Sequence, residues 1–271
     1  VYKRQAHSSC GIHIHVDGAN HTAVSLRRLV NFMTARQDLI YEALQIGDRE
    51  SSWCHKLNKT LLDAMKKDKY FTKEKAEEIW YSRANDGYCG GIDHQHYNST
   101  RYHGVNLHSF FTKGTVEFRL FNSTLHAGKI KAYIQFCLAV SAWAITSQEK
   151  IVFRSMDGYT PEQKVTIMRN ILTHRLGLYG DEFKTCRLHL MTPLKKAAGM
   201  TCRAVSKKCW PIGTTGRLEN NMGKLYVAYG SNLNLKQMAY RCPSASIYST
   251  GQLTNWELLY SCLLYTSPSP R

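Results

Sequence analysis

The stretch Cys10-Gly11-Ile12-His13-Ile14-His15-Val16-Asp17-Gly18 alternates aliphatic and imidazole side chains with a period of two. Successive side chains of a β-strand point to opposite faces, so His13 and His15 share one face and the aliphatic residues share the other. The pattern predicts a strand that packs one face on a core and presents two imidazoles on the other.

The run Thr115-Val116-Glu117-Phe118-Arg119-Leu120-Phe121 has the same period. Its apolar residues at 116, 118 and 120 share one face, and Glu117 and Arg119 share the opposite face. This second strand therefore adds a carboxylate and a guanidinium to the two imidazoles.

A third run, Arg101-Tyr102-His103-Gly104-Val105-Asn106-Leu107-His108-Ser109, alternates Val105 and Leu107 with Asn106 and His108. If the three strands pair in one sheet, their apolar faces pack on helices and their polar faces line a single cleft. We expect metal ligands, a phosphate-binding arginine and hydrogen-bonding amides in that cleft.

Each pair of polar residues also has a simpler interpretation. His13 and His15 are compatible with an ordinary exposed strand face, and Glu117 with Arg119 is compatible with a solvated ion pair of little energetic value. Their joint occurrence on alternating strands favours the functional interpretation.

Apolar spacing and capping residues predict the helices of the domain. An amphipathic helix follows the first strand and packs across the sheet, and the most apolar helix is a core helix. Thr72 and Thr160 are expected helix caps, and Pro161 and Gly177 mark a start and an end. The expected helices span residues 25–44, 72–80, 127–146, 162–176 and 180–190, and residues 81–98, with His94 and His96, are expected to form an exposed loop.

Four runs carry a resemblance to a known family: residues 10–18, 101–109, 114–125 and 180–185 resemble the amidoligase family, a distant branch of the glutamine synthetase and glutamate–cysteine ligase fold. The resemblance covers roughly residues 6–198. It implies an α+β fold in which helices pack on one face of an antiparallel sheet and a polar cleft lies on the other. It also implies an ATP-dependent ligase that joins a carboxylate to an amine through an acyl-phosphate.

The resemblance implies roles for single residues. Arg119 corresponds to the catalytic arginine that steadies the transferred phosphate, and His15 to a cofactor-binding residue on the nucleotide side. Arg101 and Asn106 lie in the stretch that contacts substrate or phosphate in the family, which implies a catalytic role for the first and a cofactor-binding role for the second.

His13 and Glu117 correspond to ligands of Mg²⁺ or Mn²⁺. Mg²⁺ prefers oxygen ligands and Mn²⁺ accepts an imidazole, so the two residues need further carboxylates. In the relatives a Glu-x-Glu strand near the start of the domain supplies them, and nothing like it precedes Cys10. We therefore expect a domain that is truncated at its amino end and a fragment that is inactive.

A second resemblance starts at Met222. The run Lys224-Leu225-Tyr226-Val227-Ala228-Tyr229-Gly230-Ser231-Asn232-Leu233 is similar to the amino-terminal end of gamma-glutamylcyclotransferases, in which a strand enters a turn that holds a glutamyl group. The resemblance implies a partial α/β unit over 222–262, with Tyr229, Gly230, Ser231 and Asn232 binding the glutamyl group. Without the downstream acidic base we expect no cyclotransferase activity.

The segments outside these units receive separate interpretations. Residues 199–221 are either a linker or intergenic read-through, so the second unit is either a true fusion or a neighbouring gene read in frame. Residues 1–5 and 263–271 look like adapter read-through from a metagenomic assembly and are left out of the fold prediction.

Composition narrows the class of protein. The chain has 271 residues and 43% hydrophobic content, and no run approaches the roughly 18 apolar residues that span a bilayer. Nine cysteines without paired Cys-x-x-Cys spacing indicate reduced thiols of a cytoplasmic protein.

The formal net charge of +16 permits nucleic-acid binding, but much of it lies in residues 56–75 and 195–208, which are typical of solvated faces. The expected partners are therefore small-molecule or peptide carboxylates and amines, with no membrane. Two other functions remain open, a metal-dependent hydrolase that uses the His-x-His strand and a non-catalytic binding module. Arg119 favours the ligase, because hydrolysis needs no phosphate clamp.

Overall fold

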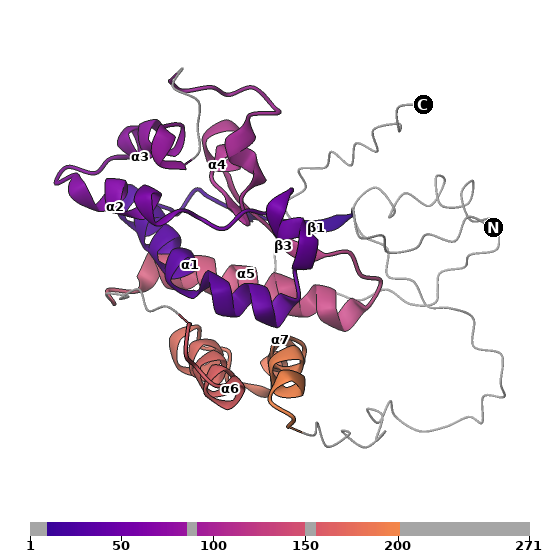
Figure 1. Cartoon of the computed structure of the whole chain (residues 1–271). Coiled ribbons are helices and arrows are strands. Elements are labelled where there is room, and N and C mark those ends of the chain that lie inside the picture. Colours follow the sequence, from indigo (N-terminus) through magenta and orange to yellow (C-terminus); the bar gives the residue numbers. More distant parts are fainter. Residues whose placement is uncertain (1–9, 86–90, 150–155, 201–271) are drawn as a thin grey trace, which may run out of the picture. The chain divides into compact units, whose positions relative to one another are not determined.

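The computed structural model of the chain describes residues 10–85, 91–149 and 156–200 (Figure 1). These residues form an α+β structure in which helices predominate and one antiparallel sheet has three strands in the order β1-β3-β2. The predicted α+β class is confirmed. The predicted second unit, with Tyr229, Gly230, Ser231 and Asn232, lies outside the described residues, as do both end segments and most of the predicted linker.

The sheet contains the three strands predicted from the alternating runs: β1 (Gly11–Asp17), β2 (Val105–Asn106) and β3 (Thr115–Asn122). The central strand, β3, pairs with both neighbours, so that Glu117 lies opposite His15 of β1 and opposite Asn106 of β2. The strand register therefore sets His15, Glu117 and Asn106 in one row across the sheet.

The third predicted strand is shorter than expected, because β2 keeps only two residues and a helix, α4 (His108–Lys113), follows it almost at once. The Asn106 Oδ1 atom accepts a hydrogen bond from the His108 backbone amide at 2.8 Å, a local bond that competes with strand pairing. The expectation that His108 joins the polar face beside Asn106 is wrong. The His108 ring is buried and its Nδ1 atom lies 2.7 Å from the Tyr81 hydroxyl.

A β-bulge interrupts the pairing of β1 with β3. Ile12 lies opposite Phe121 and Ile14 opposite Phe118, so that His13 alone faces two residues of β3, Arg119 and Leu120. The extra residue brings Phe121 to the core side along with Leu120, and both side chains are fully buried. The simple alternation of the sequence therefore ends at Arg119.

Two long helices, α1 (Ala23–Leu44) and α5 (Ala127–Thr146), pack against each other and against the sheet (Figure 1). Both were predicted within two residues of these bounds. The ring of Phe32 lies 5.1 Å from that of Trp143 between the helices, and Tyr133 stacks on Phe121 of the sheet at 4.3 Å. Fully buried residues of this core include Leu26, Leu29, Val30, Val116, Phe118, Leu120 and Phe136.

Capping explains where several helices begin. Thr72 caps α3 (Lys73–Trp80), and Thr160 forms a reciprocal capping box with Gln163 in α6 (Pro161–Asn170), so both predicted caps are confirmed. The helix predicted to reach residue 176 continues from α6 as a π-helical turn over Ile171–Arg175 and stops before Gly177, which has a φ of +68°.

The remaining helices surround this framework. The helix expected from residue 180 is α7 (Lys184–Ala197), which packs on α1, α5 and α6 after a short 3-10 turn. No helix was predicted over α2 (Lys59–Lys67), a short lysine-flanked helix that packs on α1 and α3 and buries Leu61, Leu62 and Met65. Among the described residues, no helix is both long and apolar enough to cross a membrane.

Candidate functional site

Glu117 is the centre of the candidate site. Its Oε2 atom accepts a hydrogen bond from Asn106 Nδ2 at 2.6 Å, and its Oε1 atom lies 2.9 Å from His13 Nδ1 and 3.6 Å from His15 Nε2. The β3 register brings His15 and Asn106 to the two sides of the carboxylate, and the bulge brings His13 to it from the position opposite Arg119. Three strands thus converge on one acidic group.

Arg119 completes the cluster from the same strand as Glu117. Its Nη1 atom lies 3.0 Å from Glu117 Oε1 and 3.4 Å from His13 Nδ1, and its Nε atom donates to the Trp53 carbonyl at 3.4 Å. Only 4% of the Arg119 side chain and 6% of the Glu117 side chain are exposed. The alternative of a solvated ion pair is therefore wrong, because the pair forms the buried floor of the site.

The charges of the Glu117 carboxylate and the Arg119 guanidinium stabilise each other. Burial raises the pKa of Glu117, but the hydrogen bond from His13 and the charge of Arg119 outweigh it and hold the pKa well below its usual range. Burial lowers the pKa of Arg119 and the Glu117 carboxylate opposes that change, so a guanidinium stays charged here. Glu117 is thus an anion and Arg119 a cation across the physiological pH range.

The two imidazoles form the accessible part of the site. About a third of each ring is exposed, 35% of the His13 side chain and 31% of the His15 side chain. The His15 Nδ1 atom lies 2.8 Å from Thr115 Oγ1 and 3.3 Å from Ser109 Oγ, which fixes the orientation of the ring. Burial lowers the pKa of His15 more than Glu117 raises it, so the ring is mainly neutral at pH 7.

The four residues predicted to line one cleft, His13, His15, Glu117 and Arg119, are therefore brought together. What differs from the expectation is the depth at which they lie. The acid and the guanidinium are enclosed by protein, and only the imidazoles face solvent.

The arrangement of these residues does not fit a resident Mg²⁺ or Mn²⁺ ion. Among the residues that the structure describes, no group of three or more His, Cys, Asp or Glu could hold a metal. Glu117 is the only carboxylate of the cluster, and the Arg119 guanidinium lies against both Glu117 Oε1 and His13 Nδ1, where a shared cation would bind. An octahedral cation also needs more oxygen ligands than one carboxylate supplies.

Asn106, predicted to bind the cofactor, lies in the same row of the sheet as Glu117 and His15. Its side chain is buried, with 1% of the residue exposed, and both amide atoms bond within the protein, to Glu117 and to the His108 backbone. In this arrangement the Asn106 amide orients the carboxylate of Glu117.

Arg101 lies beside the cluster rather than in it. Its guanidinium donates to the His96 carbonyl and lies 5.7 Å from the centre of the Tyr102 ring. The Arg119 guanidinium lies 5.6 Å from the same ring centre, and the charge of Arg101 lowers the pKa of Arg119. The two arginines therefore share one aromatic ring and one electrostatic environment.

Several residues that hold the site in place were not found from the sequence. Buried Arg49 donates from Nη1 to the Phe121 carbonyl at 2.7 Å and from Nη2 to the Arg119 carbonyl at 3.4 Å, and it thereby holds the bulged half of β3. Trp53 supplies the carbonyl that accepts the Arg119 Nε hydrogen bond. Both lie outside any strand or periodic run, and no local pattern in the sequence distinguishes them.

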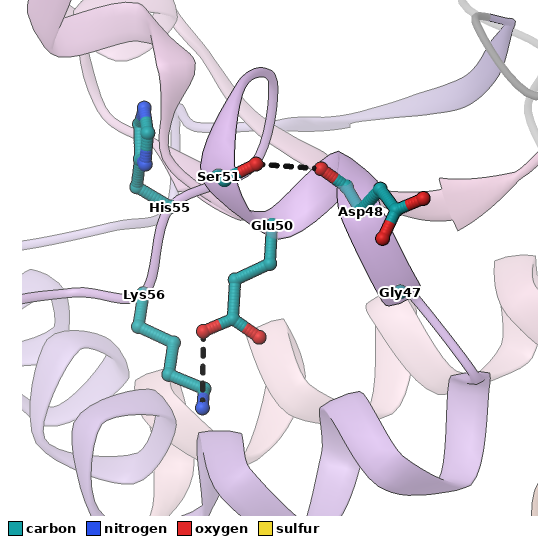
Figure 2. A pocket seen from close by; sticks show the side chains of 6 residues that line it. All are labelled: Gly47, Asp48, Glu50, Ser51, His55 and Lys56. Atoms are coloured by element: carbon teal, nitrogen blue, oxygen red, sulfur yellow. Dashed lines mark hydrogen bonds and ion pairs between the residues drawn. The ribbon is translucent and has the colours of Figure 1, made fainter.

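A polar hollow occurs in the segment that contains Arg49 and Trp53 (Figure 2). Within it, Lys56 Nζ lies 3.1 Å from Glu50 Oε1, and the Ser51 hydroxyl donates to the Asp48 carbonyl at 2.9 Å. The lining residues are Gly47, Asp48, Glu50, Ser51, His55 and Lys56. None of these residues was expected in the cleft.

The chain matches the model of a known protein family. The model of a family described as "putative amidoligase enzyme" matches residues 2–141, which include all three strands and every predicted site residue of the first unit. No curated protein and no solved structure shows significant similarity to the chain.

Proposed function

Because the chain belongs to this amidoligase family, we propose that it is an ATP-dependent ligase that joins a carboxylate to an amine. The observation that carries the proposal is the buried Glu117–Arg119 pair beneath two open imidazoles. A fixed guanidinium at the floor of a polar site can stabilise phosphoryl transfer, because charge is spread over the transferred phosphoryl oxygens.

The reaction has two steps. An oxygen of the substrate carboxylate forms a bond to the γ-phosphorus of ATP while the bond between that phosphorus and the bridging oxygen breaks, which releases ADP. The amine nitrogen then attacks the acyl carbon, loses a proton, and displaces inorganic phosphate as the amide forms. In this scheme Arg119 stabilises the transferred phosphoryl group, and Glu117 holds Arg119 in place.

The charge balance around the site favours anionic substrates. Arg101 lowers the pKa of Arg119, and Lys113 lowers the pKa of His15, so both cations lie within electrostatic reach of the cluster. With Arg119, three permanent cations thus act on a cluster that contains the single carboxylate of Glu117. Such an excess of positive charge raises the local concentration of polyphosphates and carboxylates.

The open imidazoles supply polar contacts to the substrates, with His15 proposed on the nucleotide side. Since the described residues do not fit a resident metal, Mg²⁺ is assigned to the MgATP substrate, where the phosphates provide most of its ligands. No step of the scheme requires His13 or Glu117 to coordinate that ion.

A turnover assay tests the proposal. ADP release is measured with MgATP over a panel of carboxylates and amines on the product of the restored full-length gene, because the fragment by itself is expected to be inactive, and turnover should require both acceptors. Glu117→Gln and His13→Asn should each reduce turnover by about a hundredfold or more, the scale of losing one preorganised polar group of an active site.

His94→Asn is the matched control, because His94 lies outside the cluster with its Nε2 atom 2.6 Å from Glu77 Oε1. It should leave turnover nearly unchanged. Absence of ATP turnover over the whole panel, together with cleavage of peptide bonds, would favour the metal-dependent hydrolase instead. Absence of both activities would favour a binding module.

A further inference from the structure

A chain of alternating aromatic and guanidinium groups runs from the surface to the floor of the site. The guanidinium carbon of Arg101 lies 5.6 Å from the ring centre of Tyr97 and 5.7 Å from that of Tyr102. The guanidinium carbon of Arg119 lies 5.6 Å from the ring centre of Tyr102. The ring of Trp53 meets Tyr102 edge to face at 5.8 Å. We call these five residues the aromatic–arginine ladder.

Exposure changes along the ladder. Tyr97 and Trp53 are 76% and 44% exposed, Arg101 and Tyr102 are partly buried, and Arg119 is buried. A Trp53 indole that is this exposed, and that meets the Tyr102 ring which two guanidinium groups contact, is not explained by packing of the core. It leaves a flat apolar surface free for a ligand.

Backbone hydrogen bonds, as well as ring contacts, connect the ladder to Arg119 at the floor of the site. The Trp53 carbonyl accepts from Arg119 Nε, and the Gly104 carbonyl, two residues beyond Tyr102, accepts from the Arg119 amide at 2.8 Å. A molecule lying on Trp53 and Tyr102 therefore has its next contacts at Arg101 and Arg119. These contacts are planar aromatic at one end and cationic at the other.

A nucleoside phosphate has the matching chemistry. Its base stacks on aromatic faces irrespective of its hydrogen-bonding edge, and its phosphates pair with arginine. A simple dicarboxylate or a peptide would use the arginines but would leave the indole face without a planar partner.

The geometry points to a nucleotide-base site on Trp53 and Tyr102, with the phosphate chain of the bound ATP directed to Arg101 and Arg119. This inference rests on the proposed function and adds the residues that bind the base. A ligand of this site must carry both a planar base and a polyphosphate chain.

Binding measurements on the full chain, without any turnover, test the site. Isothermal titration compares a non-hydrolysable ATP analogue with inorganic tripolyphosphate. The wild-type chain should bind the analogue at least about tenfold more tightly, the size of one base-stacking contact. Trp53→Ala should abolish that advantage and leave the affinity for tripolyphosphate unchanged.

Two further variants keep the result interpretable. Trp53→Phe retains an aromatic face and should keep most of the preference for the analogue, which separates stacking from a folding defect. Tyr179→Ala removes an aromatic side chain that is 75% exposed elsewhere in the chain, and it should change neither affinity.

The outcomes separate this inference from the proposed function. If the wild-type chain prefers the analogue and Trp53→Ala keeps that preference, the base binds elsewhere and the inference is overturned while ATP use stands. If the wild-type chain binds the two ligands equally, the base is not recognised and the inference fails. If it binds neither, the proposed ATP-dependent function fails as well.

Discussion

Arg119 Nη1 lies 3.0 Å from Glu117 Oε1, and both side chains are withdrawn from solvent although the residues are two apart on one strand. Burial of an ion pair is costly, and replacing such a pair by apolar residues is often neutral or stabilising. Stability alone therefore does not account for its presence. Its position beneath two open imidazoles is instead consistent with a role in chemistry.

The first prediction concerns the stability of this pair. Glu117→Gln leaves the Arg119 cation buried without its counter-charge, so the free energy of unfolding should fall by about 3 kcal/mol. Urea denaturation measures the change. The double variant Glu117→Gln/Arg119→Met removes both charges and should recover much of the loss, whereas an additive further loss would show that the two residues are not coupled.

The second prediction concerns the support of Glu117 by Asn106. Asn106→Ala removes the 2.6 Å hydrogen bond to Glu117 and leaves the His108 backbone amide without its acceptor, so unfolding should become easier by about 1–3 kcal/mol. Ligase turnover should fall as well, because the carboxylate loses its orientation. Asn170→Ala, a change at an exposed position of α6, should alter neither quantity.

The third prediction concerns Gly104. A Cβ atom at this position would lie 2.1 Å from the Tyr41 hydroxyl and 2.3 Å from Leu120 Cδ2, so Gly104→Ala forces buried groups apart. The free energy of unfolding should fall by about 1–3 kcal/mol, the usual cost of overpacking. Addition of Tyr41→Phe removes the nearest atom and should restore part of the loss. An unchanged denaturation midpoint in Gly104→Ala would contradict the described packing.

The fourth prediction is a pH dependence of stability. His21 is buried between Ser25 and Ser141, with contacts of 3.0 and 2.8 Å, and burial with the nearby Lys73 charge lowers its pKa to about 4. The unfolded chain takes up this proton near its ordinary pKa of about 6.5, before the folded chain does. The contribution of His21 is therefore complete above about pH 6.5 and is lost as the pH falls toward about 4, by at most about 3 kcal/mol.

Denaturation at about pH 7.5 and about pH 5 measures this effect. His21→Gln should reduce the difference between the two pH values, and His108, whose pKa burial also lowers to about 4, contributes in the same direction. His174→Gln, at an exposed position, is the control and should leave the difference unchanged. An identical pH dependence in wild type and His21→Gln would contradict the burial of a neutral imidazole.

Much of the fold follows from local patterns. Alternation placed His13, His15, Glu117 and Arg119 on strand faces, and apolar spacing with caps located α1, α3, α5 and α6. These signals are strong because a period of two or 3.6 residues repeats along the whole element. The sheet and the convergence of the four residues follow from them once the strands pair.

The differences arise where tertiary or very local bonds override the pattern. The Asn106 side chain binds the His108 amide and ends β2, and the bulge at His13 changes the face on which Phe121 lies. Arg49 donates to backbone carbonyls of β3, and Trp53 accepts from Arg119 through its own backbone carbonyl; such contacts have no periodic signature. The depth of Glu117 and Arg119 likewise depends on segments far away in the sequence.

Isotope transfer tests the acyl-phosphate mechanism, since an acyl-phosphate carries one carboxylate oxygen into inorganic phosphate. The product of the restored full-length gene is incubated with MgATP, an amine and a carboxylate labelled with heavy oxygen, and the released phosphate is analysed by mass spectrometry. We expect one labelled oxygen per phosphate in the wild-type protein and strongly reduced phosphate release in Arg119→Met. Amide formation with unlabelled phosphate, or full activity in Arg119→Met, would contradict this mechanism.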